Sequence, residues 1–225
     1  MTLRLAVLAS GRGSNLRAIL DAICAGRLDA RVVGVFSDRA EAAALRIARD
    51  AAIEAHAFDP KVYPHRFAFD EAMFSAVEAV QPDLIVMAGY MRLVSHAAVA
   101  PRIGRMLNIH PSLLPAFKGL HTHRQALDAR AAVHGASVHV VTPELDGGPV
   151  VSQARIDVHT GDTPESLAAR VLAREHPLLT ETLRLFADGR LQWRHDAVHC
   201  DGASLVHPLQ LGDDDRLAID PPPCA

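Results

Sequence analysis

The sequence has few cysteines, no long apolar run and no strong excess of one charge. Cys24, Cys200 and Cys224 are far apart in a chain of 225 residues. That spacing fits neither a disulfide framework nor a zinc ribbon, so we expect a reducing, cytoplasmic location. No run approaches the roughly 20 apolar residues of a membrane helix. The net charge is −3 with both signs interspersed, which argues against a nucleic-acid surface.

Apolar residues and histidines are abundant. Apolar residues make up 49% of the chain, which is enough for the core of one large domain with a small appendage. Thirteen histidines make metal binding a possibility to weigh. The clearest candidates are His121 and His123 in GLHTH. Catalytic zinc usually has three protein ligands, so we expect no metal here.

Apolar strand-like runs alternate with helical segments from residue 3 to residue 110. We expect strands at 3–10, 30–37, 54–58, 83–90 and 106–110, and helices at 15–26, 41–51 and 67–80. The rhythm predicts an α/β fold with a Rossmann-like, doubly wound, mostly parallel sheet. The strands are almost wholly apolar, as they are when helices cover both faces of a sheet.

The pattern changes in the C-terminal part. The segments 136–142 and 149–158 alternate apolar and polar residues, which predicts an antiparallel strand pair. Thr163 and Pro164 predict a helix start, and the helix should end near Gly189. Pro177 inside it predicts a kink or break. We expect residues 200–225, with DDD and PPP, to form a loosely ordered tail.

GRGSN, residues 11–15, joins the first strand to the first helix. Glycine lets the backbone approach a ligand, and the helix start offers free N–H groups that bind phosphate. The third glycine of a dinucleotide fingerprint is missing and no GK[ST] follows, so a single phosphate fits better. The alternative is a tight turn in which Ser14 caps the helix. The residues alone leave both interpretations open.

Asn108 and His110 lie at the end of an apolar strand, just before Pro111. Residues two apart in a strand point the same way, and ligands bind at the carboxyl ends of parallel strands. An amide and an imidazole aimed at one point can stabilise negative charge and move a proton. The alternative is a structural histidine. Two such groups before a rigid proline favour function.

The third polar element is ELDGGP, residues 144–149. A carboxylate near His110 would stabilise its imidazolium form, and Asp146 is the candidate. On spacing alone, a plain hairpin turn explains this segment better.

Together these segments resemble the phosphoribosylglycinamide formyltransferase family of folate-dependent enzymes. The resemblance covers about residues 3–195 and rests on GRGSN, MAGYMRLVS, LNIHPSLLPAFKGLHTHRQAL, HGASVHVVTPELDGGPVVSQA and REH. It implies direct transfer of the formyl group of 10-formyltetrahydrofolate to the amine of glycinamide ribonucleotide, in purine biosynthesis, without a metal. The implied partners are these two small molecules, with no nucleic acid or membrane, and the chain would be a monomer or homodimer.

The resemblance also implies roles for residues. Asn108 and His110 hold the developing oxyanion, His110 donates a proton, and Asp146 supports it. The residues implied for the ribonucleotide are Gly13, Ser14, Asn15 and Glu175. Those implied for the folate are Arg66, Met91, Arg92, Leu93, Val94, Asn108, Thr142, Pro143, Glu144, Leu145 and Asp146. We expect a domain over 1–199, with a phosphate-binding half to about 105 and a folate and catalytic half from 106.

One departure from the family concerns Leu172. Relatives often carry Gln or Lys three positions before Glu175, where the side chain reaches the phosphate, and leucine cannot do this. Arg174 would lie about 200° around the helix from Leu172.

Two other functions are weighed: a formyltetrahydrofolate deformylase and an inactive nucleotide-binding module. The deformylase usually has an N-terminal regulatory domain, which we do not expect because the sequence opens on the first strand. A methionyl-tRNA formyltransferase would need a further domain and a basic surface. The complete Asn108, His110 and Asp146 set argues against an inactive module.

Overall fold

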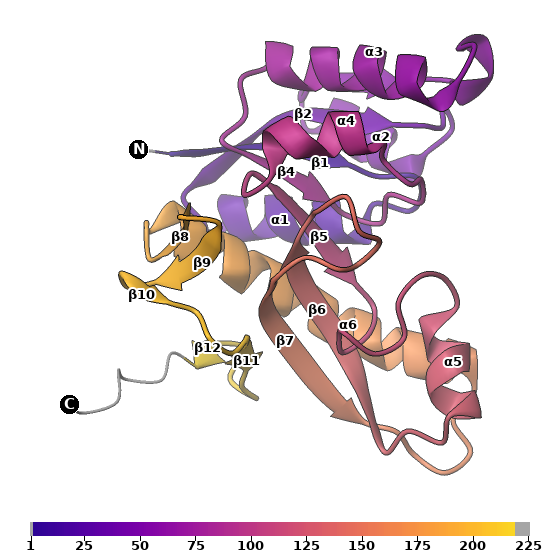
Figure 1. Ribbon diagram of the computed structural model, residues 1–225, viewed down its shortest axis with the longest axis vertical. Coiled ribbons are helices and arrows are strands. Elements are labelled where there is room, and N and C mark those ends of the chain that lie inside the picture. Colours follow the sequence, from indigo (N-terminus) through magenta and orange to yellow (C-terminus); the bar gives the residue numbers. More distant parts are fainter. Residues whose placement is uncertain (1, 219–225) are drawn as a thin grey trace.

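A computed structural model describes residues 2–218 of the chain. A nine-stranded sheet in the order β12-β11-β7-β6-β5-β4-β1-β2-β3 has helices on both faces, and a separate sheet has the order β10-β9-β8 (Figure 1). The five strands from β3 to β5 in that order run parallel, whereas β6 is antiparallel to both β5 and β7. The predicted fold class is confirmed.

The strands of the large sheet are β1 (Leu3–Leu8), β2 (Ala30–Ser37), β3 (Ala55–Ala57), β4 (Leu84–Met87), β5 (Met106–His110), β6 (Val133–Val140), β7 (Val150–Asp157), β11 (Leu209–Leu211) and β12 (Leu217–Ala218). The small sheet contains β8 (Leu191–Arg194), β9 (Ala197–Cys200) and β10 (Ala203–Ser204). The helices are α1 (Ser14–Cys24), α2 (Ala43–Asp50), α3 (Arg66–Ala79), α4 (His96–Val99), α5 (Thr122–Asp128) and α6 (Pro164–Ala187), with short 3-10 turns η1 (Pro60–Val62) and η2 (Ala100–Arg102).

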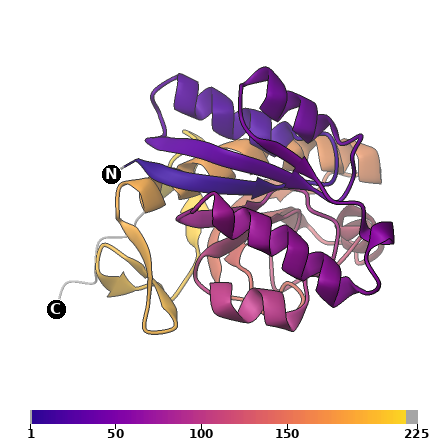
Figure 2. The ribbon, with the colours of Figure 1, turned by 90° about the horizontal axis from the view of Figure 1, so that it is seen from above.

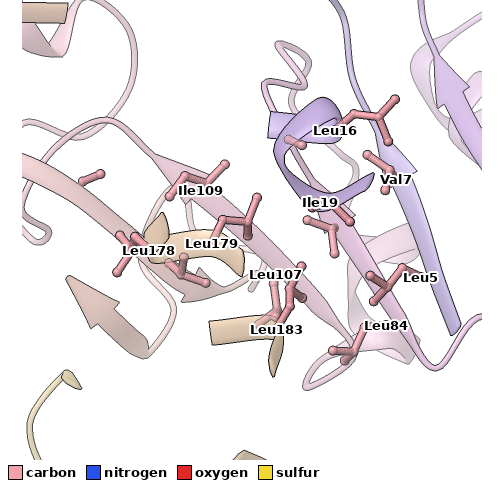
Figure 3. Close-up of a cluster of buried hydrophobic side chains, with 14 of the residues drawn as sticks. Leu5, Val7, Leu16, Ile19, Leu84, Leu107, Ile109, Leu178, Leu179 and Leu183 are labelled. Atoms are coloured by element: carbon pink, nitrogen blue, oxygen red, sulfur yellow. The ribbon is translucent and has the colours of Figure 1, made fainter. Parts of the chain in front are cut away.

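Alternation along β1 divides the interior into two cores. Leu5 and Val7 pack in the core that contains α1, α2 and α6, whereas Ala6 and Leu8 pack in the core of α3 and α4. Figure 2 shows the two helix layers on opposite sides of the strands. Figure 3 shows the first core, which includes Leu5, Val7, Leu16, Ile19, Leu84, Leu107, Ile109, Leu178, Leu179 and Leu183.

The strand order places the functional edge of the sheet. β1 lies between β2 and β4, so the chain leaves β1 and β4 in different directions, the arrangement that forms a ligand site at the carboxyl ends. The loops after these two strands are joined: Ser10 N donates to Gly89 O at 3.0 Å, and Met91 N donates to Ser10 Oγ at 2.9 Å. The GRGSN and MAGYMRLVS segments therefore meet at one edge.

Helix α6 begins as predicted but does not break at Pro177. Thr163 and Ser166 form a reciprocal cap, with Ser166 N to Thr163 Oγ1 at 3.2 Å and Thr163 N to Ser166 Oγ at 2.9 Å. One helix runs through Pro177 to Ala187. An internal proline costs about 3 kcal/mol. Several fully buried leucines after it, each worth about 2 kcal/mol on burial, outweigh that cost.

The predicted loose tail is wrong for residues up to 218. β11 adds to β7 as a parallel strand, and Leu209, Leu211 and Leu217 are buried. The turn between β11 and β12 is tied to α6 by ion pairs, including Arg174–Asp215 at 2.7 Å. The acidic run suggested disorder, but the three spaced leucines around it supply the apolar face that holds these strands. The PPP segment lies outside the described residues.

The small sheet packs against the turn before β5 through Trp193. Gly104 has φ +85°, and a Cβ built on it would overlap the indole of Trp193 in β8. Only glycine permits this contact at the start of β5.

A histidine pair, with His134 buried and His123 half-buried, lies between α5 and β6. His123 Nδ1 is 3.2 Å from His134 Nε2, and the ring of Phe117 meets that of His134 edge-on at 5.8 Å. His134 is 0% exposed, and its burial lowers its pKa from 6.5 to about 4. The pair is therefore neutral at pH 7 and packs under the loop that follows β5.

We expect Gly104→Ala to lower the free energy of unfolding by about 2–5 kcal/mol, because it combines overpacking with left-handed strain. In a Trp193→Ala background the cost should fall to about 1–2 kcal/mol, the strain alone. Urea unfolding of the four proteins measures this. An equal cost in both backgrounds would show that the indole contact is not responsible.

We expect His134 to make stability depend on pH below 6.5. The folded state resists protonating a group whose pKa is about 4, while the unfolded chain protonates near 6.5. Stability is therefore fully present above pH 6.5 and lost as pH falls, by about 2 kcal/mol between pH 7 and pH 5. His134→Gln should remove this part of the slope in urea unfolding, and His207→Gln, at an exposed site, should not. Identical slopes for wild type and His134→Gln would refute it.

Candidate active site

The end of β5 carries two polar side chains that point to one side. Asn108 lies opposite His139 of β6, and His110 lies opposite Ser137. Asn108 Nδ2 is 3.1 Å from His139 Nε2. The apolar neighbours Leu107 and Ile109 face the core instead. The period of the strand thus separates the core face from the polar face.

Asp146 completes this cluster from the loop between β6 and β7. Its Oδ2 is 3.6 Å from His110 Nδ1, and its Oδ1 is 3.6 Å from His139 Nε2. The Gly119 N–H donates to Oδ2 at 2.9 Å. The side chain is only 9% exposed. The structure therefore brings Asn108, His110 and Asp146 together.

The second glycine after Asp146 is needed for close packing. A Cβ on Gly148 would overlap the carbonyl of Val140, whereas a Cβ on Gly147 would meet only the exposed side chain of Glu144, which can move. Asp146 itself, with φ +46°, takes the left-handed conformation. The DGG segment is therefore more than a plain hairpin turn, since it directs a carboxylate at two imidazoles.

One proton position on His110 is fixed by the backbone. His110 Nε2 lies 3.1 Å from Phe117 O. A carbonyl only accepts, so Nε2 carries the hydrogen and, in the neutral ring, Nδ1 is the unprotonated nitrogen. Nδ1 faces Asp146. A second proton on Nδ1 would place an imidazolium beside a carboxylate, so this atom can take up and release a proton.

His139 is the functional-site residue that sequence reasoning left unassigned. Its Nδ1 lies 3.0 Å from Val140 O, so Nδ1 is the protonated nitrogen and Nε2 accepts from Asn108. Burial lowers the pKa of His139, opposed by its bond to Val140 and by Asp146. The neutral ring fixes which way the Asn108 amide points. The sequence would have indicated this role only if β5 and β6 had been paired in the correct register, which puts His139 opposite Asn108.

Buried polar groups hold the loop that carries Phe117. Leu114 N donates to Ser137 Oγ at 3.0 Å, and Gln153 Nε2 donates to Leu114 O at 2.9 Å. Both side chains come from the antiparallel strands β6 and β7. They therefore fix the carbonyl that orients His110.

The GRGSN turn forms the start of α1. Gly13 is the residue before the helix, with φ +73°, and a Cβ there would lie 2.8 Å from Ala44 Cα. Ser14 is the first helical residue, and no side chain caps the helix. The alternative in which Ser14 caps the helix is therefore wrong. The first N–H groups of α1 have no intrahelical partners.

Asn15 and Glu175 join this helix start to α6. Asn15 Nδ2 donates to Glu175 Oε2 at 3.0 Å. Asn15 is 6% exposed, and its Oδ1 has no partner within residues 2–218. Burial raises the pKa of Glu175, opposed by the bond from Asn15 and by the charges of His110 and Arg12. Gly13, Ser14, Asn15 and Glu175 thus form a second polar cluster near the first.

Three of the residues predicted for the folate expose large apolar side chains. Met91, Leu93 and Leu145 are exposed, although their side chains are large and apolar. Arg92 stacks 4.8 Å over the Phe69 ring, and Val94 packs against the core of α3 and α4.

The remaining predicted folate residues are less connected. Thr142 is half-buried, Pro143 and Glu144 are exposed, and Glu144 pairs with Lys118 at 2.9 Å. Arg66 is exposed at the first residue of α3, and in the described part of the chain no hydrogen bond or ion pair links its side chain to the others.

Side-chain groups that could hold a metal and helices that could span a membrane are both absent from residues 2–218. These residues contain no group of three or more His, Cys, Asp or Glu side chains placed to hold a metal. His123 bonds to His134, whereas His121 is exposed. Within the same residues, no helix has the length and apolar character to cross a membrane.

Comparison with known proteins gives a consistent result. A formyl transferase family model matches residues 3–183. The phosphoribosylglycinamide formyltransferase of Escherichia coli K12 is 45% identical over 203 residues, covering 90% of this chain and 96% of its own.

Solved structures agree. The phosphoribosylglycinamide formyltransferase of Coxiella burnetii has a TM-score of 0.87 and 44% identity, covering 92% of this chain and 97% of its own. Glycinamide ribonucleotide transformylase 1 of Symbiobacterium toebii has a TM-score of 0.84 and 48% identity, covering 88% and 94%. With the family model spanning most of its length, this chain belongs to the formyl transferase family.

Proposed function

We propose that the chain transfers the formyl group of 10-formyltetrahydrofolate to the amine of glycinamide ribonucleotide, a step of de novo purine (IMP) biosynthesis. The observation that carries this proposal is the cluster of Asn108, His110 and Asp146 beside a helix start suited to phosphate. Relatives that share nearly half of its residues bear the names of this activity.

The two polar clusters suit the two substrates. The uncapped N–H groups of α1 suit the phosphate of the ribonucleotide, and Asn15 and Glu175 offer polar contacts to the rest of it. The formyl folate would lie over the exposed side chains of Met91, Leu93 and Leu145. In this proposed arrangement the amine and the formyl group would lie near His110.

The proposed reaction is one addition and one elimination. The amine nitrogen attacks the formyl carbon, a C–N bond forms, and the carbonyl electrons move to oxygen. The Asn108 amide and protonated His110 stabilise this oxyanion. The bond to the folate nitrogen then breaks, that nitrogen gains a proton from His110, and the attacking nitrogen loses one.

Asp146 has two effects in this scheme. Its carboxylate, 3.6 Å from His110 Nδ1, stabilises the imidazolium that the oxyanion needs. It can also accept the proton that leaves the attacking amine, through a water molecule. Protonated Asp146 then passes this proton to His110, so that His110 is again protonated and Asp146 ionised, without a metal or a covalent enzyme intermediate.

We infer a cytoplasmic location. Cys24 and Cys200 are free thiols in the described part of the chain. Free thiols and a formyl folate substrate both suit a reducing compartment.

We expect Asp146→Asn and His110→Ala to lower kcat by about 10²–10⁴-fold, because each removes charge stabilisation or proton transfer at the oxyanion. Formyl transfer, followed optically at saturating substrates, measures this, and circular dichroism checks folding. Asp128→Asn is the matched control, because it makes the same carboxylate-to-amide change at an exposed residue of α5, and it should keep the wild-type kcat. Near wild-type turnover in either site variant would exclude the proposed roles.

A further inference from the structure

The helix start at GRGSN needs a cation to hold a phosphate monoester. A helix start is equivalent to roughly half a positive charge, whereas a phosphate monoester carries about −1.5 to −2 near neutral pH. The carboxylate of Glu175 lies at the same place through its bond to Asn15. Some other side chain must therefore supply positive charge.

Helix α6 does not supply that cation. Leu172 lies one turn before Glu175 on the same face, and it is apolar. Arg174 is held elsewhere by Asp215 Oδ1 and Gly212 O, each at 2.7 Å. Arg170 donates to Asp157 O at 2.9 Å and pairs with Asp162. The ordered tail thus holds Arg174 away from the site.

Arg12 remains available. It stands between Gly11 and Gly13 in the turn itself, and its side chain is exposed. Within residues 2–218 it makes no hydrogen bond or ion pair, but its charge acts on Glu175 and lowers the pKa of that carboxyl against the effect of burial. Arg12 directly precedes Gly13, the residue before α1, so it lies at the end of α1 that Asn15 joins to Glu175.

An independent observation indicates that a ligand belongs there. Asn15 Oδ1 is buried without a partner in the described residues. A buried acceptor left unpaired costs about 1–3 kcal/mol, so a donor from a bound molecule would recover that energy. The hydroxyls of a ribose are such donors.

We propose that Arg12 is the phosphate-binding cation of this chain, forming paired hydrogen bonds from its guanidinium to the phosphate of the ribonucleotide while the N–H groups of α1 hold the other oxygens. The proposal rests on the function proposed above. Paired contacts are the geometry in which arginine binds phosphate best. Arg12 would thereby distinguish a ribonucleotide from the corresponding ribonucleoside.

The test compares two ligands, glycinamide ribonucleotide and its dephosphorylated ribonucleoside. Calorimetry gives Kd for wild type, Arg12→Ala, Arg12→Lys and Arg17→Ala, where Arg17 is an exposed arginine of α1. Arg12→Ala should weaken ribonucleotide binding about 10–100-fold and leave the ribonucleoside unchanged. Arg12→Lys should restore part of the loss, and Arg17→Ala should bind as wild type does.

Two results would overturn the role of Arg12. One is unchanged ribonucleotide affinity in Arg12→Ala. The other is an equal loss for both ligands, which would indicate a general change of the site. Wild-type protein that binds the ribonucleotide but transfers no formyl group would overturn the proposed function alone, and the affinities would still decide on Arg12.

Discussion

The contact between Asp146 and two imidazoles is the constraint on which the site depends. The Gly119 amide donates to this enclosed carboxylate, the imidazolium form of His110 stabilises it, and Nε2 of the neutral His139 ring lies 3.6 Å from it without donating. These three groups come from different parts of the chain: β5, β6 and the loop after β5. The mixed sheet brings these parts together, because β6 returns antiparallel to β5 and places its carboxyl end beyond Asn108. The turn at Asp146 follows from there.

Other features of the fold hold the same few atoms in place. Ser137 and Gln153 fix the loop whose Phe117 carbonyl orients His110. His134 packs under that loop as a neutral ring. Because β1 lies between β2 and β4, the start of α1 at GRGSN lies at the same edge of the sheet as the end of β4. Buried polar groups on the sheet therefore position the reacting groups on the loops.

Local patterns predicted most of the fold. Continuous apolar runs predicted the parallel strands, and alternating apolar and polar residues in 136–142 predicted the antiparallel pair. Both patterns follow from which faces of a strand are buried. Asp146 was different: its own surroundings indicate only a turn, and only pairing of distant strands brings it to His110. His139 was missed for the same reason. Pro177 and the acidic tail misled because tertiary packing of leucines outweighs local preference.

The most direct measurement is formyl transfer by the purified protein from 10-formyltetrahydrofolate, followed optically with and without glycinamide ribonucleotide. We expect turnover only when the ribonucleotide is present, because the cluster of Asn108, His110 and Asp146 lies near a helix start suited to phosphate. Turnover of equal rate in its absence would mean that water accepts the formyl group, and the chain would then be a deformylase.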